Sequence, residues 1–502
     1  MLKSIGFVTF TKIIIQTIGF IITIIVARRF GIGNDIGVYF YAYGIVLTPV
    51  VIFNLSARSL VVTELNLHQF KRVDLFSSFV RFLIKFSIIS AGIATFLLIF
   101  IVELNSYLGF LTLDDDLFKR VVYFLLPMSF ILMLSEILTG VFNSKKTFGW
   151  PEVTEIIKVL ITLLSLVLFS EVMGIFSLVL GSVFGSLVSA SLLFCVIKKK
   201  YLITKGLTSN ISESIVDFKS RFYGLASSNI MIAIQPVIIT SYISLIGIHS
   251  VSTYSYMVKI VSIPSFILAS TIYVAFSHWS DFASKQENEK IKNSSLTVLL
   301  AGSIIIGVFL AVFILEGNLI IQILFGDDDY FDYNDFLYLS VVLIVSSLLQ
   351  FSITTLTRIM QALRMVKHIN IYRLVFFLVS LSIIQTSFYF LEGGLDIVVY
   401  SLLAINIVML MYVIILLYIK EVIEIVFVLY IIKVVSITVA LALVIPSFVE
   451  SILGYMIIES KVIRSLFSIF IAVFVYLSIL SILFKNTIQE ILKNIFKGDH
   501  YK

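Results

Sequence analysis

The chain has 502 residues, of which 60% are hydrophobic and only 13% are charged. A soluble domain carries about 25% charged residues and could not bury this much apolar surface in its core, so the composition excludes a soluble protein and predicts a membrane protein. The formal net charge of +6 is less informative than the position of each charge along the chain. The single cysteine, Cys195, excludes an intrachain disulfide and a cysteine-based metal site.

A membrane-spanning helix needs about 20 mostly apolar residues, and the chain contains fourteen such runs. The first run lacks a small-residue cleavage site, so we expect a retained helix there instead of a cleaved signal peptide. The connections between the runs are too short for a soluble catalytic domain. In chain order, the expected spans are 5–27, 36–57, 80–102, 120–142, 153–170, 175–197, 222–246, 251–277, 296–315, 336–357, 369–390, 397–419, 425–448 and 463–484.

Lys and Arg residues in the connections indicate the orientation of the spans. If the N-terminus is cytoplasmic, most of them fall on the cytoplasmic side, including Arg58 and the run 198–200, whereas the outer connections carry the acidic runs 114–116 and 327–329. The positive-inside rule therefore places both termini in the cytoplasm, which an even number of spans also requires. We expect the acidic runs to be solvated loops, because their spacing does not match a calcium-binding loop.

The sequence resembles itself at an offset of 215 residues. Because six spans lie within this offset, the two halves have the same orientation and are related by a pseudo-two-fold axis along the membrane normal. The most informative aligned pairs are Tyr39 with Tyr254, Tyr41 with Tyr256, Pro49 with Pro264, Gly92 with Gly307, Asp114 with Asp329, and Lys158 with Arg373.

This repeat predicts an all-α membrane protein with two six-helix lobes and two appended helices. We expect an N-lobe at 1–200, a basic cytoplasmic linker at 201–221, a C-lobe at 222–420, and spans 13 and 14 with a cytoplasmic tail at 421–502. Two lobes that face each other across a central cavity are typical of transporters.

Two prolines occupy matching positions inside spans of the two halves. Pro49 and Pro264 each remove a backbone hydrogen bond and kink their helices. One interpretation is that they are hinges of a rocking transporter. The other is that they are simply tolerated, since neighbouring helices can satisfy the freed backbone groups.

Ionisable side chains at membrane depth are the first candidates for a functional site, because each costs about 3 kcal/mol at the bilayer centre. Lys259 and Lys12 lie deep, and we interpret Lys259 as a cation that faces the cavity. Lys158 and Arg373 are further candidates, although long side chains near a helix end can instead extend to the interface. The full set is Lys12, Lys85, Glu136, Glu155, Lys158, Lys259, Arg373 and Lys433. Because cations predominate, we predict a cavity for an anionic passenger.

The two carboxylates of this set have more than one interpretation. Glu136 and Glu155 are candidates for binding a coupling proton or sodium ion. Alternatively, Glu136 pairs with a lysine, and Glu155 pairs with Lys158, which lies three residues further along the same helix. We expect no metal site and no other cofactor.

Tyrosines near the outer face form a second group of candidates. Tyr39, Tyr41, Tyr254 and Tyr256 could stack on sugar rings and hydrogen-bond to their hydroxyl groups. The alternative is ordinary packing, or a position in the aromatic belt at the membrane interface.

Several short stretches carry a family resemblance. They are Gly19-Phe20, VARRFGIG at 26–33 followed by Tyr39-Phe40, FNSKKTFGWP at 142–151, YMVKIVSIP at 256–264 and ILFG at 323–326. Together they resemble the polysaccharide exporters of the MOP superfamily, which includes multidrug and toxin extruders, oligosaccharide-lipid flippases and polysaccharide exporters. The resemblance covers residues 1 to about 420.

The resemblance implies a flippase that moves an undecaprenyl-diphosphate-linked oligosaccharide repeat unit across the bacterial inner membrane by alternating access. Such a protein would serve the synthesis of O-antigen, capsule or exopolysaccharide. Lys12, Lys158, Lys259 and Arg373 would then bind the diphosphate. The implied partners are the lipid-linked glycan, membrane lipid, a polysaccharide polymerase and chain-length machinery. We expect a monomer that does not bind nucleic acid.

Three alternatives remain open. Lipid II flippases of peptidoglycan synthesis also resemble the chain, but Gln16 and Ile22 occupy their arginine positions in the first helix, and Lys259 replaces a third arginine. These departures favour a Wzx-type flippase, although most Wzx-type proteins have twelve helices. A MATE-type multidrug antiporter would need carboxylates in the first spans, which 5–27 and 36–57 lack. A membrane-embedded glycan polymerase would need a cluster of reactive groups, which the five scattered histidines do not provide.

Overall fold

A computed structural model gives the fold of the chain. It describes residues 2–65, 72–108, 115–145, 147–201, 212–326, 333–363, 365–390, 394–454 and 461–484.

Within these residues the regular elements are all helices, so the predicted all-α class is confirmed. Each of the fourteen expected spans corresponds to one long helix, and thirteen of the described helices are long and apolar enough to cross a membrane. The protein is therefore a multi-pass membrane protein. The long helices are α1 (Leu2–Phe30), α2 (Asn34–Phe53), α4 (Val73–Leu108), α5 (Asp115–Ser144), α6 (Gly149–Met173), α7 (Phe176–Tyr201), α8 (Ser212–Ile246), α9 (Ile248–Ser284), α10 (Asn288–Phe325), α11 (Tyr333–Ala362), α12 (Val366–Phe390), α13 (Leu395–Ile419), α14 (Ile425–Gly454) and α15 (Lys461–Leu483).

Most helices are longer than their apolar runs, because a helix can continue past the hydrocarbon into polar sequence. The span expected at 296–315, for example, lies within the 38-residue helix α10. Helix α6 begins at Gly149, four residues before the expected span at 153–170. As a result, some side chains that the sequence had placed in connections lie within helices.

A π-helix, η1 (Asn54–Arg58), follows α2 and leads into the short helix α3 (Ser59–Leu65). The sequence did not predict it, because a π-helix has no clear composition of its own. Two contacts with α8 hold this segment: Asn229 donates to the Ser56 hydroxyl at 2.9 Å, and Arg221 pairs with Glu64 at 3.0 Å. Burial raises the pKa of the Glu64 carboxyl, against the opposing effect of the Arg221 guanidinium. Short π-helical segments are frequent at functional sites.

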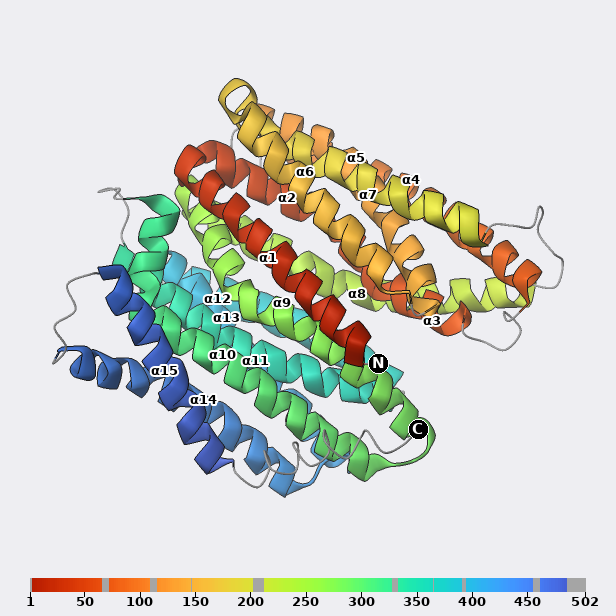
Figure 1. The fold of residues 1–502 in the computed structure, drawn as a ribbon. Coiled ribbons are helices and arrows are strands. Elements are labelled where there is room, and N and C mark those ends of the chain that lie inside the picture. The colour runs from red at the N-terminus through yellow and green to blue at the C-terminus, as the bar shows by residue number, and fades with distance from the viewer. Residues whose placement is uncertain are drawn as a thin grey trace. The chain divides into compact units, whose positions relative to one another are not determined.

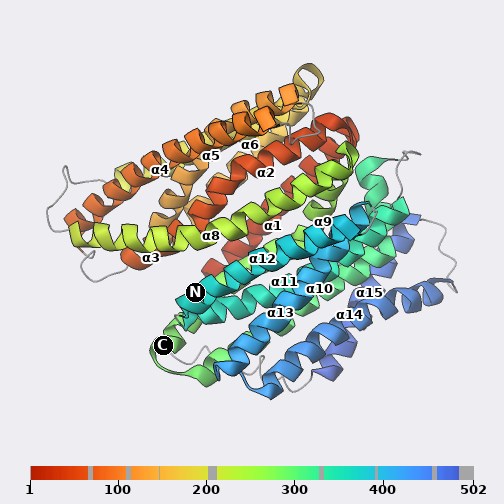
Figure 2. The ribbon, with the colours of Figure 1, turned by 180° about the vertical axis from the view of Figure 1, so that it is seen from behind.

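The chain forms two compact units, and both are drawn in Figures 1 and 2. The first contains Met1–Tyr256 and Arg373–Leu381, and the second contains Met257–Tyr372 and Ser382–Lys502. Helix α8 thus packs with the first unit. The lobe boundaries expected from the repeat, at 200 and 222, stay a prediction.

Aromatic packing explains why α8 belongs to the first unit. Phe222 of α8 lies edge-on against Phe86 of α4, with ring centroids 4.9 Å apart. Phe218 and Phe53 add further ring contacts to the same cluster. Such pairs contribute about 0.5–1.5 kcal/mol each beyond the area that they bury, so the first half of α8 is firmly attached to α2 and α4.

Small residues let helices α6 and α7 approach closely, and the two lie side by side in Figure 1. A Cβ added at Gly185 would lie 2.6 Å from the Lys158 carbonyl oxygen, and one at Gly181 would lie 2.8 Å from Ser165. Close approach through glycine and serine is the usual way to pack helices in lipid, where hydrophobicity does not drive them together.

In the second unit, α14 and α15 pack on α10. Gly307 of α10 permits this, because a Cβ there would collide with Tyr476 of α15 and with Thr438 of α14. The Tyr476 side chain is fully buried. The two helices that the repeat identified as appended are therefore well packed against their own unit.

Both candidate hinge prolines lie inside helices, as the sequence predicts. Pro49 lies in α2, five residues before η1 begins, and Pro264 lies in α9. Three other helices also contain an internal proline: α5, α8 and α14. An internal proline is thus common in this protein, and the role of Pro49 and Pro264 as hinges stays a prediction.

Candidate functional site

Three ion pairs lie on helices of the first unit that are long and apolar enough to cross a membrane. Lys12 of α1 approaches the Glu152 carboxylate of α6 to 3.0 Å. On α6 itself, Lys158 lies 2.5 Å from Glu155. The site therefore combines charges from helices that are far apart in the sequence.

The third pair joins η1 to α5. The Arg58 guanidinium lies 3.9 Å from the Glu136 carboxylate. Glu136 also interacts electrostatically with Glu155, Lys158 and Lys12, so the three pairs form one network. We call these six side chains the charge network: Lys12, Arg58, Glu136, Glu152, Glu155 and Lys158.

The charge network is balanced, with three cations and three carboxylates. Four of these side chains were expected within spans, whereas Arg58 and Glu152 were assigned to connections. The structure places Arg58 in η1 and Glu152 in the first turn of α6. The excess of cations expected over the full set of intramembrane charges stays a prediction. Glu152 could have been found from its spacing, since it lies three residues before Glu155 and six before Lys158 on one helix face.

The network is only partly shielded from its surroundings. The side chains of Lys12 and Arg58 are 25% and 32% exposed, and those of Glu136 and Glu152 are 20% and 10% exposed. One Glu136 carboxylate oxygen is buried without a hydrogen bond to any residue that the structure describes. The Lys12–Glu152 contact is likewise an ion pair without hydrogen-bond geometry. Loosely held charges of this kind can exchange partners.

Arg373 of α12 also lies in the first unit and is only 7% exposed. Its guanidinium donates a hydrogen bond of 2.6 Å to the Ser228 hydroxyl of α8. A second bond, 2.9 Å from Gln235 to Ser380, joins the same two helices. The repeat aligns Arg373 with Lys158, so equivalent positions carry cations. Arg373 donates to a hydroxyl among its contacts, and Lys158 pairs with a carboxylate.

Lys259 lies in the second unit, in the first third of α9 and five residues before Pro264. Its side chain is half-buried, and its carbonyl accepts a hydrogen bond of 2.8 Å from Ser262. Its predicted role as an anion-binding cation stays a prediction.

Three of the four candidate tyrosines pack between helices. The Tyr41 hydroxyl shares a hydrogen bond of 2.9 Å with Ser241, and Tyr256 donates to the Gly31 carbonyl at 2.9 Å. Tyr39 is also buried. The packing interpretation therefore describes these three side chains, and Tyr254, which is half-buried, has more surface to offer a sugar ring.

The described residues contain no group of three or more His, Cys, Asp or Glu side chains that could hold a metal ion. The charge network itself brings together opposed charges on partly exposed side chains. Cations there can bind a phosphate-bearing head group, and carboxylates there can bind a proton or a small cation.

Neither a protein-family model nor a curated protein matches the sequence. Solved structures do match the fold. A structure described as the lipid II flippase MurJ in an inward closed conformation has a TM-score of 0.72 and 16% identity, covering 96% of this chain and 99% of that one.

Two other matches have lower scores. An inward-facing multidrug resistance MATE family transporter of the MOP superfamily gives a TM-score of 0.66 at 12% identity, with 80% of this chain and 96% of that chain covered. A MOP superfamily transporter from Pyrococcus furiosus, described as having a binding pocket of reverse polarity, gives a TM-score of 0.64 at 13% identity. The match covers 82% of this chain and 94% of that chain. These matches show that the chain has the two-lobed fold of MOP superfamily transporters.

Proposed function

We propose that the protein is a flippase for a lipid-linked oligosaccharide with an anionic diphosphate head, and that it works by alternating access. The observation that carries this proposal is the set of cations at membrane depth in the first unit, in a chain with the fold of MOP transporters. A buried cation is costly, and it is retained where it binds a charged passenger or a charged partner.

The charge network can bind an anionic passenger and release it again. In the absence of a diphosphate, Glu152 and Glu155 neutralise Lys12 and Lys158, which lowers the cost of holding these cations in the membrane. A diphosphate has oxygen acceptors that can replace these carboxylates. Because the side chains are only partly buried, the exchange requires no unfolding of the helices.

Arg373 is a further proposed cation of the first unit, and Lys259 is the proposed cation of the second unit. Arg373 presents a planar guanidinium, which suits phosphate oxygens better than an ammonium group does. The full proposed set of diphosphate-binding cations is Lys12, Lys158, Lys259 and Arg373, with Tyr254 as a sugar contact.

The passenger would be an undecaprenyl-diphosphate-linked repeat unit of O-antigen, capsule or exopolysaccharide, and the membrane would be the bacterial inner membrane, with both termini in the cytoplasm. A glycan polymerase and chain-length machinery would act on the product. A lipid II flippase is the first alternative, since a structure described as one shares the fold.

A second candidate function is cation-coupled multidrug extrusion, as the fold is also that of MATE transporters. The carboxylates Glu136, Glu152 and Glu155 favour it, because they supply the acidic groups that the first two spans lack. Each of them, however, lies within 4 Å of a cation, which reduces its attraction for a cationic drug. In the flippase, Glu136 and Glu155 are the candidates for proton or sodium coupling.

A flipping assay in proteoliposomes tests the proposal. The wild-type protein should move undecaprenyl-diphosphate-linked glycan across the bilayer, and it should move the same glycan on a phosphate-free undecaprenol far more slowly. We expect Lys259→Ala to abolish the flipping of the diphosphate form while the protein still inserts in the membrane. Equal transport of the two lipids would contradict the role of the cations, and proton-dependent efflux of cationic dyes would favour the second candidate.

A further inference from the structure

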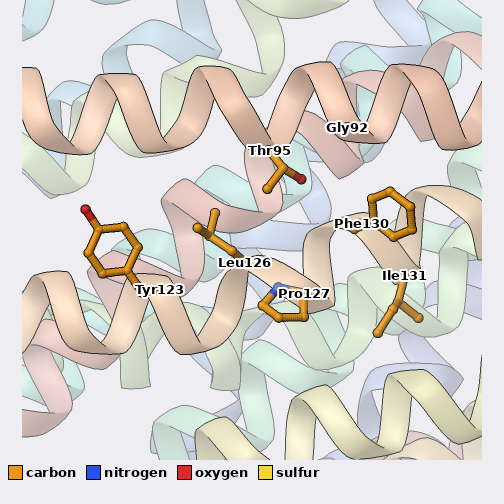
Figure 3. Close-up of a pocket in the computed structure, with 7 residues that line it drawn as sticks. All are labelled: Gly92, Thr95, Tyr123, Leu126, Pro127, Phe130 and Ile131. Atoms are coloured by element: carbon orange, nitrogen blue, oxygen red, sulfur yellow. The ribbon is translucent and has the colours of Figure 1, made fainter.

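A pocket of about 530 Å³ lies between α4 and α5 in the first unit, and its lining includes no residue of the charge network. Figure 3 shows the lining residues of the two helices, with Thr95 pointing from one helix toward Leu126 and Pro127 on the other. The volume lies within the range of roughly 300–1,000 Å³ that is common for small-molecule sites. The lining residues are Gly92, Thr95, Tyr123, Leu126, Pro127, Phe130 and Ile131.

The sequence explains why a pocket forms at this place. Gly92 has no side chain, and no described atom lies within 4 Å of the point where its Cβ would be. Pro127 has no backbone N–H, so the helix cannot satisfy the carbonyl of Tyr123 in the usual way. The Thr95 hydroxyl is buried without a hydrogen-bond partner among the described residues.

The pocket opens toward hydrocarbon. Large apolar side chains around it are exposed on both helices, including Ile93 at 58%, Phe96 at 69% and Phe124 at 62%. Exposed side chains of this kind, on helices that are long and apolar enough to cross a membrane, face lipid. The occupant that meets such a surface is an acyl chain.

The internal repeat provides an independent comparison. Gly92 of α4 aligns with Gly307 of α10, and in the second unit the space beside Gly307 is filled by Tyr476 and Thr438 from the appended helices. The first half has no counterpart of those helices in the repeat. The helix surface beside this glycine is thus covered by protein in the second half and left open in the first half.

One face of α5 continues from the pocket to the start of the helix and becomes polar. Tyr123 lies at the edge of the pocket, Arg120 lies one turn before it, and Asp116 lies one turn before Arg120. Arg120 and Asp116 are exposed. On the neighbouring α4, Glu103 accepts a hydrogen bond from Tyr123 and lies 3.8 Å from Lys119, so this carboxylate already has partners.

The order of groups along this face matches one kind of lipid. A helix rises about 1.5 Å per residue, so Asp116 lies roughly 6 Å further from the pocket than Arg120 does. In phosphatidylethanolamine the phosphate likewise lies between the acyl chains and the outermost ammonium group. We propose that the pocket holds an acyl chain of phosphatidylethanolamine, with its phosphate at Arg120 and its ammonium at Asp116.

Native mass spectrometry of the full-length protein tests this site without the transport substrate, so its outcome is independent of the proposed function. The probes are phosphatidylethanolamine and phosphatidylglycerol with identical chains. The wild type should retain the ethanolamine lipid preferentially. Gly92→Phe, which fills the pocket, should reduce retention of both lipids at least tenfold, and Thr95→Leu should reduce it less. Gly224→Phe is the matched control, because Gly224 of α8 also has open space at its Cβ.

Substitutions of the two charged residues test the two contacts of the head group separately. Asp116→Asn should reduce the preference for the ethanolamine lipid about fivefold. Arg120→Gln should reduce the retention of both lipids by a similar factor, as expected for the loss of one charge near the membrane surface. Unchanged lipid retention in both Gly92→Phe and Thr95→Leu would overturn the site. An unchanged preference in Asp116→Asn would overturn the choice of lipid. A change of oligomeric state in Gly92→Phe would show that a second copy occupies the surface.

Discussion

Helices α6 and α12 occupy equivalent places in the internal repeat but differ in charge. The offset of 215 aligns Glu152 with Lys367, Glu155 with Asn370, and Lys158 with Arg373. In α6 each of the two carboxylates lies beside a lysine, whereas the aligned positions of α12 carry no carboxylate, and Arg373 donates to the hydroxyl of Ser228. The cation is common to both halves, and the carboxylates belong to only one.

This difference teaches that the cations of the two helices do not have the same availability for an anion. A diphosphate must displace the Glu155 carboxylate from Lys158, and at Arg373 it must compete with the Ser228 hydroxyl for the guanidinium. A full opposite charge attracts a cation more strongly than a neutral hydroxyl does, because the Coulomb energy depends on both charges. We therefore expect Arg373 to contribute more to anion binding than Lys158 does.

The largest effect should come from giving α6 the charge pattern of α12. The double substitution Glu152→Lys with Glu155→Asn leaves Lys12, Arg58 and Lys158 without two of their three carboxylates. Breaking a fully buried ion pair costs about 3–5 kcal/mol, and these two pairs are partly exposed and so contribute less each. Because two pairs are lost together, we expect the yield of folded protein and its melting temperature to fall. Adding Lys12→Glu to this variant should restore much of the loss. A melting temperature equal to that of the wild type would show that Glu152 and Glu155 are not needed to neutralise the cations of the network.

The next largest effect should be on transport. Arg373→Ala should slow the flipping of the diphosphate-linked glycan about a hundredfold, because a hydrogen bond to a charged group contributes roughly 1.5–3 kcal/mol and a guanidinium can donate two parallel bonds to phosphate oxygens. Arg373→Lys should keep part of the rate, and Lys158→Ala should slow it less than Arg373→Ala does. Lys85→Ala is the control, since Lys85 is an exposed cation of α4 outside the network. Equal losses for Lys158→Ala and Arg373→Ala would remove the distinction between the two helices.

A smaller effect is expected for the coupling between Lys12 and Glu152. These side chains are 25% and 10% exposed, so their pair lies between a surface salt bridge and a fully buried one. A double-mutant cycle with Lys12→Ala and Glu152→Ala should give a coupling free energy of about 1–2 kcal/mol in thermal or denaturant unfolding. A coupling near zero would mean that the 3.0 Å contact does not stabilise the protein.

The smallest effect on stability should come from Glu136→Gln. The carboxylate lies 3.9 Å from Arg58 without a hydrogen bond to it, so we expect a change below about 1 kcal/mol. If Glu136 binds the coupling ion, the variant should nevertheless lose the dependence of transport on a proton or sodium gradient. Unchanged gradient dependence would leave Glu155 as the remaining candidate.

Much of the fold could be predicted from the sequence, because hydrophobic length alone identifies a membrane-spanning helix. All fourteen expected spans correspond to long helices, and both Pro49 and Pro264 lie inside them as expected. Part of the site was also accessible, since Lys158 pairs with Glu155 at the spacing of three residues that the sequence suggested.

The rest of the site depends on contacts that no local pattern reveals. Lys12 meets Glu152 across 140 residues of sequence, and Arg58 reaches Glu136 only because η1 extends the helix after α2. Tyrosines at an expected interface can equally well be packed, as Tyr41 and Tyr256 are. Which polar side chains meet is a property of tertiary packing, whereas which segments span the membrane is a property of composition.

The central claim is that cations at membrane depth bind the diphosphate of the passenger. The most direct measurement is the affinity of the purified protein in nanodiscs for undecaprenyl diphosphate, with undecaprenol as the neutral reference, in wild type and in Arg373→Ala. We predict that the wild type binds the diphosphate at least a hundredfold more tightly than undecaprenol and that Arg373→Ala loses most of this preference. Equal affinity of the wild type for both lipids would contradict the claim.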